Sequence, residues 1–193
     1  RFFRMAERRI VEKQNPGQGI VCFISNYSWL DGLSFTGMRE RYLEVFDRIS
    51  IDCLNGDKYK TGKLTPEGEP DPSVFSTESN REGIQVGTAI ALLTKTGSGS
   101  PDGAIRYRDL WGKDKRDQLL RECLGESTAE YEDVVPPLPL GLPFAVKRVS
   151  AGYIEWPLLP NLFQHCSPGV KTSRDLDLVA IDRGTLERKL AVY

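Results

Sequence analysis

A short, uninterrupted run of apolar residues constrains the fold of this chain more than any other feature. Residues 20–24, IVCFI, are mostly β-branched or aromatic, and a polar loop follows them directly. Such a run predicts a strand covered on both faces, as in the parallel sheets of α/β proteins. Ligands of these sheets bind beyond the carboxyl ends of the strands. Tyr27 and Trp29, which follow the run, are therefore candidate ligand contacts, unless both rings only cap the core.

Helical and strand patterns alternate over the first 130 residues. The alternation favours an α/β fold in which the elements form half of a doubly wound sheet. A segment rich in Gly, Pro and charge, residues 55–83, interrupts the pattern, and so long a loop is usually functional or disordered. The predicted helices cover residues 1–13, 34–46 and 113–124, and the predicted strands cover residues 19–25, 48–54, 84–97 and 104–112.

Four prolines between residues 136 and 143 indicate a linker, so we place a domain boundary near residues 130–140. Residues 131–193 are then expected to form the linker and a small mixed α+β segment. A last helix is expected from Gly184 onward. The strand patterns in this part cover residues 144–150, 153–156 and 178–182.

The composition excludes few classes of protein. No apolar run approaches the about 20 residues that a membrane-spanning helix needs. The net charge of −1 provides no global basic field for nucleic acid, although a neutral total can still contain a basic cleft. The cysteines, two of them in strands predicted to be buried, have no C-x-x-C spacing, and with a single histidine, His165, a zinc site is not expected. Reduced thiols in a cytoplasmic protein are the simplest interpretation.

One glycine-containing loop fails as a phosphate-binding motif, and a second has residues suited to binding phosphates or bases. In GDKYKTGKL, residues 56–64, five residues separate the glycines and Leu64 stands where a magnesium-binding hydroxyl is required. The loop GVKTSRD, residues 169–175, is more informative, because its two cations and two hydroxyls suit phosphates or base edges. The alternative for this loop is a solvated turn whose charges pair with neighbouring aspartates.

Several ordered segments carry a resemblance to a known family. The stretch GIVCFISNYSWLDGLSFTGMRERYLEVFDRISIDCLNG, followed by GIQVGTAIALLTK and IRYRDLWG, resembles the second half of an N6-adenine DNA methyltransferase domain. The most similar family is the type ISP restriction-modification enzymes, single chains that join nuclease, helicase-like ATPase, methyltransferase and target-recognition domains. GYIEWPLLPNLF and PGVKTSRDLDLVAID are similar to the stretch after the methyltransferase core of that family.

The resemblance implies a fold and a division of the chain. The fold would be a partial Rossmann-like methyltransferase sheet with its helices. Residues 19–25 would be its fifth strand, residues 48–54 its sixth, and residues 86–95 its seventh, which runs antiparallel into the sheet. Residues 1–130 would be the C-terminal half of the methyltransferase domain. Residues 131–193 would be the linker and the beginning of the target-recognition region.

The resemblance also implies site residues. Ile84 and Gln85 would lie where the family's eighth motif approaches an adenine that has left the duplex stack. Family members often stack an aromatic residue on that base, so Phe75 and Tyr59 are alternatives to Ile84. Tyr27 and Trp29 would lie beside the same cleft. In the loop 169–175, Lys171, Thr172 and Arg174 would contact DNA.

The catalytic half of such an enzyme is absent from this sequence. The family binds S-adenosylmethionine through a glycine-containing loop. It catalyses methyl transfer with an Asn-Pro-Pro-aromatic motif, and Asn15-Pro16-Gly17 of this sequence does not replace that motif. We expect both motifs upstream of Arg1, in a parent protein whose other domains and double-stranded DNA are the partners of this chain. The chain alone is expected to be inactive and to contain no catalytic, cofactor-binding or metal-binding residue. The alternatives are a non-catalytic nucleic-acid-binding or assembly module, and a hydrolase-like enzyme that uses His165.

Overall fold

The computed structural model describes residues 2–12, 18–96, 105–150, 152–163, 165 and 178–192. The chain divides into two compact units, Arg1–Val149 and Ser150–Tyr193. The first unit therefore extends beyond the boundary expected near residues 130–140. The assignment of the two parts to methyltransferase and target-recognition regions stays a prediction.

The first unit contains a five-stranded mixed sheet with the strand order β1-β3-β2-β4-β5. β3 pairs antiparallel with both β1 and β2, β4 pairs parallel with β2, and β5 pairs antiparallel with β4. The predicted strands before residue 113 are confirmed, whereas β5 was not expected. The strands are β1 (Gly19–Asn26), β2 (Arg48–Asn55), β3 (Thr88–Lys95), β4 (Ile105–Asp109) and β5 (Glu132–Val134).

The insertion of β3 changes the expected sheet. β1, α2 and β2 follow one another as in a βαβ unit, but β1 and β2 are not neighbours because β3 lies between them. The sheet is thus mixed α/β, not a purely parallel half of a doubly wound sheet. The antiparallel direction of β3 agrees with the direction expected for residues 86–95.

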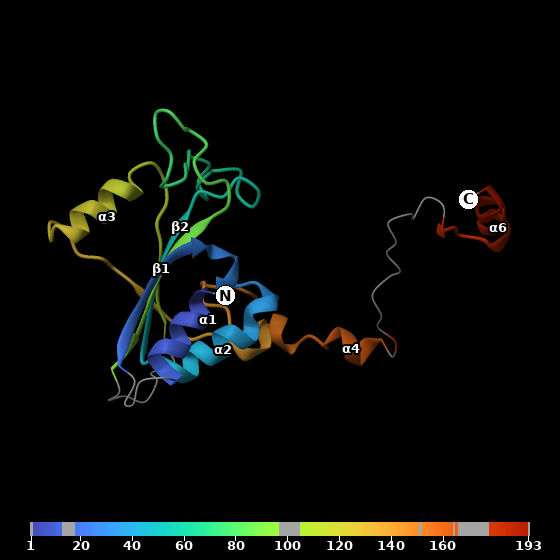
Figure 1. Cartoon of the computed structure of the whole chain (residues 1–193), viewed down its shortest axis with the longest axis horizontal. Coiled ribbons are helices and arrows are strands. Elements are labelled where there is room, and N and C mark those ends of the chain that lie inside the picture. The colour runs from blue at the N-terminus through green and yellow to red at the C-terminus, as the bar shows by residue number, and fades with distance from the viewer. Residues whose placement is uncertain are drawn as a thin grey trace. The chain divides into compact units, whose positions relative to one another are not determined.

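Helices cover the two faces of the sheet unequally. Figure 1 shows α1 and α2 together on one side of the sheet and α3 on the other. We call the side of α1 and α2 the closed face and the opposite side the open face. The helices of this unit are α1 (Phe2–Glu7), which continues as a π-helical segment (Arg8–Glu12), α2 (Thr36–Val45) and α3 (Lys115–Cys123); short 3-10 turns cover Tyr27–Leu30, Leu33–Phe35 and Leu138–Leu140.

Aromatic side chains fill the closed face. Trp29 is only 4% exposed and makes edge contacts with Tyr42 and Phe144, at ring-centroid distances of 6.4 and 5.8 Å. Phe3 from α1 joins the cluster, 4.9 Å from Phe23 of β1. Edge-to-face contacts of this kind add to the free energy gained by burying the rings.

A buried arginine fixes the far end of the first unit to its beginning. The guanidinium of Arg39 in α2 donates hydrogen bonds to the carbonyl oxygens of Trp29 and Gly32, at 2.6 and 2.8 Å. It also donates to the carbonyl oxygens of Gly141 and Leu142, at 2.7 and 2.8 Å. Because these bonds hold residues 141–142 against the core, the unit includes the proline-containing segment that the sequence suggests is a linker.

The open face corrects the expectation that β1 is covered on both sides. Ile20 and Ile24 are 64% and 49% exposed, and Cys22 between them is exposed as well. Val21, on the other face of the strand, is buried. Among the described residues, no strand pairs with the outer edge of β1, so its only neighbour is β3.

The second unit contains helices and turns in its described residues. Tyr153–Glu155 forms a 3-10 turn, and the expected final helix is confirmed as α6 (Arg183–Val192), after the short α4 (Leu159–Leu162). The strands expected at residues 144–150, 153–156 and 178–182 are not formed. The side chain of Asp182 accepts bonds from the backbone N–H and hydroxyl of Thr185, which stabilises the start of α6. None of the described helices has the length and apolar character required to cross a membrane.

Candidate nucleic-acid interface

The long loop between β2 and β3 is ordered by two buried carboxylates. The first is Asp57, whose Oδ1 accepts the backbone N–H groups of Tyr59 and Lys60, both at 2.7 Å. Its Oδ2 accepts the backbone N–H of Gly87 at 2.8 Å. Burial by itself would raise the pKa of Asp57, but the backbone donors of Gly87, Lys60 and Tyr59 outweigh burial and hold it below its usual value. The ionised carboxylate therefore fixes the turn 57–60 against the start of β3.

The second carboxylate, Asp71, joins the loop to α3. It forms a buried ion pair with Lys115, at 2.7 Å between Oδ1 and Nζ. It also accepts the backbone N–H groups of Gly56 and Gly112, at 2.7 and 2.8 Å. Burial lowers the pKa of Lys115, and the hydrogen bond to Asp71 opposes that effect.

The packing of the loop requires glycine at position 56. Gly56 has φ +73°, and an added Cβ would lie 2.9 Å from the Cα of Ser73.

Tyr59 and Gln85 form an exposed pair at the carboxyl end of the sheet. Tyr59 is 72% exposed, and its hydroxyl donates to Oε1 of Gln85 at 2.8 Å. The backbone carbonyl of Gln85 accepts the N–H of Lys58 at 2.8 Å. The carboxamide oxygen of Gln85 is thus in use, while its NH₂ group can still donate. Ile84, next in the chain, is partly exposed.

The two aromatic residues after β1 have different positions. Tyr27 lies under the turn 57–60: an added Cβ at Gly87 would be 2.4 Å from its ring, and Nζ of Lys60 is 4.6 Å from the ring centroid. Burial, with the charge of Asp57, raises the pKa of Tyr27. Trp29 instead lies in the core, where its Nε1–H donates to Oγ of Ser25 at 3.1 Å. The core-capping alternative therefore describes Trp29, whose ring is not available to a ligand in this structure.

Four lysines surround the Tyr59–Gln85 pair and its supporting turn. Lys58 and Lys63 both approach the carboxylate of Glu82, at 3.2 and 4.0 Å. Asp31 similarly binds Nζ of Lys60 and of Lys147, at 3.7 and 2.6 Å. With the ionised Asp57 beneath the turn, three carboxylates face four lysines, which still leaves a local excess of positive charge. Exposed ion pairs contribute only about 0–1 kcal/mol, so phosphates can compete for these lysines. We call Tyr59, Gln85 and these four lysines the basic rim.

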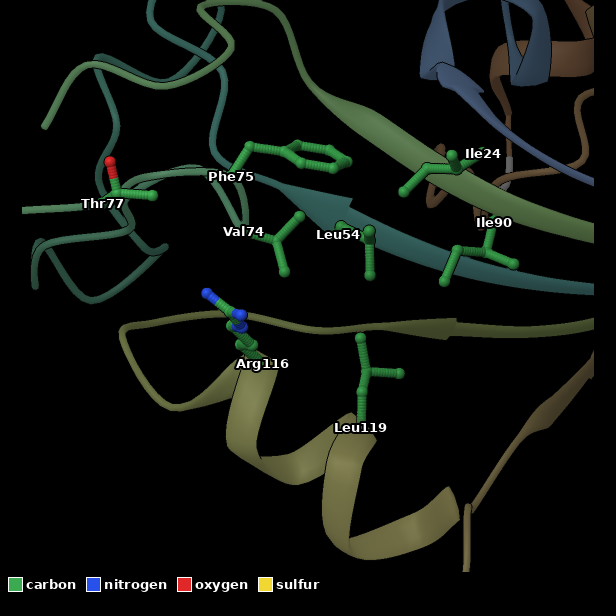
Figure 2. Close-up of a pocket in the computed structure, with 8 residues that line it drawn as sticks. All are labelled: Ile24, Leu54, Val74, Phe75, Thr77, Ile90, Arg116 and Leu119. Carbon is green, nitrogen blue, oxygen red and sulfur yellow. The ribbon is translucent and has the colours of Figure 1, made fainter. Parts of the chain in front are cut away.

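The other predicted site residues are not part of the basic rim as the structure describes it. Phe75 lines a different pocket, together with Ile24 and Leu119 (Figure 2). His165 is exposed in the second unit. Lys171, Thr172 and Arg174 lie outside the described residues. Sequence reasoning missed the lysines, although the sequence Lys58-Tyr59-Lys60 places an aromatic residue between two cations, a pattern suited to nucleic acid.

No cluster of His, Cys, Asp and Glu among the described residues could hold a metal ion.

Comparisons with known proteins give matches at the level of structure. Neither a protein-family model nor a curated protein sequence matches the chain. The chain is similar to the ATP-dependent Type ISP restriction-modification enzyme LlaBIII bound to DNA, with 25% identity and a TM-score of 0.51 over 69% of this chain and 9% of that one. It is also similar to a nuclease-deletion mutant of the Type ISP restriction-modification enzyme LlaGI in complex with a DNA substrate mimic.

In this second comparison the identity is 21% and the TM-score 0.56, over 80% of this chain and 11% of the other, so the likeness shows the fold alone. The chain spans about a tenth of the length of these two proteins.

Proposed function

We propose that this chain is part of a cytoplasmic type ISP restriction-modification enzyme and belongs to its N6-adenine DNA methyltransferase domain. The likeness to DNA-bound LlaBIII over 69% of the chain carries the proposal. The antiparallel insertion of β3 supports it, because the resemblance in sequence implies the same direction for these residues. The parent enzyme would transfer a methyl group from S-adenosylmethionine to the exocyclic amine of adenine.

This chain would contribute DNA contacts and not the methyl-donor pocket. The two buried carboxylates of the loop, Asp57 and Asp71, are poor candidates for binding the ribose of S-adenosylmethionine, because both already bind backbone N–H groups and Asp71 also binds Lys115. Neither carboxylate has a free oxygen directed at a ribose. The catalytic residues and the cofactor pocket would therefore lie in other parts of the parent protein.

The basic rim would bind DNA by exchanging partners. Lys58 would leave Glu82, and Lys60 would leave Asp31, to contact phosphates, because each loses only a weak pair at the surface. Lys63, whose side chain is only 18% exposed and donates to the backbone carbonyl of Glu82, would add positive charge from its present position. Tyr59 is the best candidate for stacking on an extruded base: it is aromatic and exposed, and Gln85 orients its ring. Ile84 would provide an apolar wall beside it, and the NH₂ group of Gln85 could donate to a base edge.

A salt titration of duplex binding by the chain tests the basic rim. The slope of the logarithm of affinity against the logarithm of salt concentration counts displaced counterions. Lys58→Ala and Lys60→Ala are each expected to reduce that slope by about 1. Arg48→Ala is the matched control, because Arg48 is an exposed cation at the opposite end of β2. Equal slopes for all three variants and the unchanged chain would refute the assignment.

The same titration separates the rim from the loop 169–175. If Lys171→Ala and Arg174→Ala reduce the slope and the rim variants do not, the DNA contacts belong to the second unit.

Two variants of Tyr59, Tyr59→Ala and Tyr59→Phe, distinguish the role of its ring from that of its hydroxyl. If the parent enzyme loses base extrusion with Tyr59→Ala but keeps it with Tyr59→Phe, the ring of Tyr59 stacks on the base and its hydroxyl is not required.

Methyl transfer distinguishes the proposal from the non-catalytic alternative. The parent enzyme should methylate adenine in duplex DNA, whereas the isolated chain should transfer no labelled methyl group. A parent protein that binds DNA through the rim but never methylates it would identify a nucleic-acid-binding module instead.

A further inference from the structure

One half of the open face is apolar and exposed. Ile20, Cys22 and Ile24 alternate along β1, and they pair across the strands with β3, where Ile90 and Leu92 lie opposite Ile24 and Cys22. Leu92 is 39% exposed, and Ile20 and Ile24 are more exposed still. We call these five residues the apolar strip. A strand face that is permanently in water normally has polar residues at alternate positions, so this pattern is typical of a covered face.

The other half of the open face is polar and already fully bonded. The guanidinium of Arg108 in β4 binds Glu122 of α3 with two hydrogen bonds, at 2.8 and 2.7 Å, and also pairs with Asp52 of β2. The ring of Tyr131 covers both Arg106 and Arg108, at 4.6 and 4.8 Å from the centroid. This half therefore already has a helix, α3, in place.

A pocket of about 320 Å³ connects the two halves. Figure 2 shows Ile24 and Ile90 of the apolar strip on one side of it and Leu119 of α3 on the other. Arg116 of α3 also lines the pocket. Its side chain is exposed and makes no hydrogen bond or ion pair with the residues that the structure describes. The apolar strip thus ends beside an unneutralised cation.

We propose that the apolar strip seats an amphipathic helix from another part of the parent protein, beside α3, with a carboxylate opposite Arg116. This inference rests on the proposed function, since the match covers only 9% and 11% of the two structures that the chain resembles. Adjacent strands are about 4.8 Å apart, so β1 and β3 together present a width of about 10 Å, which is the diameter of one helix. Along β1 the strip extends from Ile20 to Ile24, about 16 Å of strand, which is the length of a helix of about 11 residues.

Other occupants fit the strip less well. DNA would require cations along the strip, and its five residues are all uncharged. A second copy of the chain would have to bring its own strip face to face, and the five strip residues include no carboxylate for Arg116. A helix of the same polypeptide satisfies the apolar area and the charge together.

The rate at which a thiol reagent labels Cys22 reports whether the apolar strip is covered. Its thiol is exposed in the middle of the apolar strip. We expect a maleimide to label Cys22 about tenfold or more slowly in the parent protein than in this chain, because a seated helix covers it. A cysteine introduced by Leu138→Cys, at an exposed position outside the strip, should react at the same rate in both proteins. Mass spectrometry reads the labelling of each cysteine separately.

Two variants of the parent protein identify the contacts. Ile24→Glu should restore rapid labelling of Cys22, since it places a charge inside the apolar contact. Arg116→Glu should do so to a smaller extent, and Arg116→Lys should keep Cys22 protected. A photo-reactive amino acid in place of Cys22 of the otherwise unchanged parent protein should capture a segment with apolar residues at helical spacing and a carboxylate.

Three results would overturn the inference: equal Cys22 labelling in both proteins, protection of the isolated chain that increases with its concentration, or protection that requires added DNA. The second result would assign the strip to a second copy, and the third to nucleic acid. None of these measurements uses methyl transfer. A parent protein that shields Cys22 but methylates nothing would therefore contradict the proposed function and leave the seated helix intact.

Discussion

The two faces of the sheet use different forces to hold their helices. On the closed face, α1 and α2 pack through aromatic rings such as Trp29 and Tyr42, which are buried. On the open face, α3 is attached by charge: Arg108 binds Glu122, and Lys115 binds Asp71. The difference predicts that solvent conditions which weaken ion pairs will loosen α3 more than the closed face, where the pair between Arg41 of α2 and Glu7 of α1 adds to the aromatic packing.

The largest expected effect is on the closed face. Phe144→Ala should lower the free energy of unfolding by about 3–5 kcal/mol, because it leaves a cavity beside Trp29. Urea denaturation of the chain, followed by tryptophan fluorescence, measures the change. A loss below about 1 kcal/mol would mean that the segment around residue 144 does not close this core.

The ion pairs of α3 should contribute less. Glu122→Gln is expected to cost about 1–3 kcal/mol, since it replaces two charge-assisted hydrogen bonds from Arg108 with weaker ones. Hydrogen exchange should report faster exchange in α3 and unchanged exchange in α2. Equal acceleration in both helices would show that the two faces unfold as one unit and would remove the contrast.

Acid should reveal the same contrast without mutation. The hydrogen bond from Arg108 lowers the pKa of Glu122 below its usual value. A carboxyl group with a depressed pKa in the folded state contributes stability above its unfolded pKa, about 4.3, and loses it as the pH falls through the folded value. Protection of α3 against hydrogen exchange should therefore decrease below about pH 4, before that of α2. In Glu122→Gln this loss should be smaller.

The smallest effect is expected on the apolar strip. Ile20→Ala should change the stability of the isolated chain by less than about 1 kcal/mol, because the side chain is largely exposed. A loss as large as that of Phe144→Ala in the same urea experiment would mean that the strip is already covered in solution. Sedimentation at several concentrations would then show whether a second copy covers it.

The sequence predicts elements well where apolar residues alternate locally. Ile49 and Ile51 mark β2 because their spacing reflects the pleat of a strand. β5 was not predicted because its residues, Glu132–Val134, include only one apolar side chain, and the strand forms through pairing with β4. The expected strand at residues 144–150 failed for the opposite reason: Phe144 is apolar because it packs on Trp29, not because it belongs to a strand.

The candidate site was predicted only in part because long-range contacts build it. Gln85 was identified through resemblance, and Tyr59 only as an alternative. Their association depends on Asp57, which joins the turn 57–60 to Gly87. No local pattern indicates that both aspartates of this polar loop, Asp57 and Asp71, will be buried. Whether β1 is covered on both faces also depends on distant residues, so the run IVCFI could not reveal the exposed side.

The hydrogen bonds of Arg39 have a consequence for the synthesis of this protein. The guanidinium bonds carbonyl groups 102 and 103 residues later in the chain, at Gly141 and Leu142. Ribosomes add about 5–20 residues per second, so about 5–20 s pass between the appearance of the arginine and that of these acceptors. Throughout that interval Trp29 lacks Phe144, its neighbour in the finished core. A nascent chain of this protein therefore exposes its largest aromatic cluster for seconds, and a chain ended at residue 130 would expose it permanently.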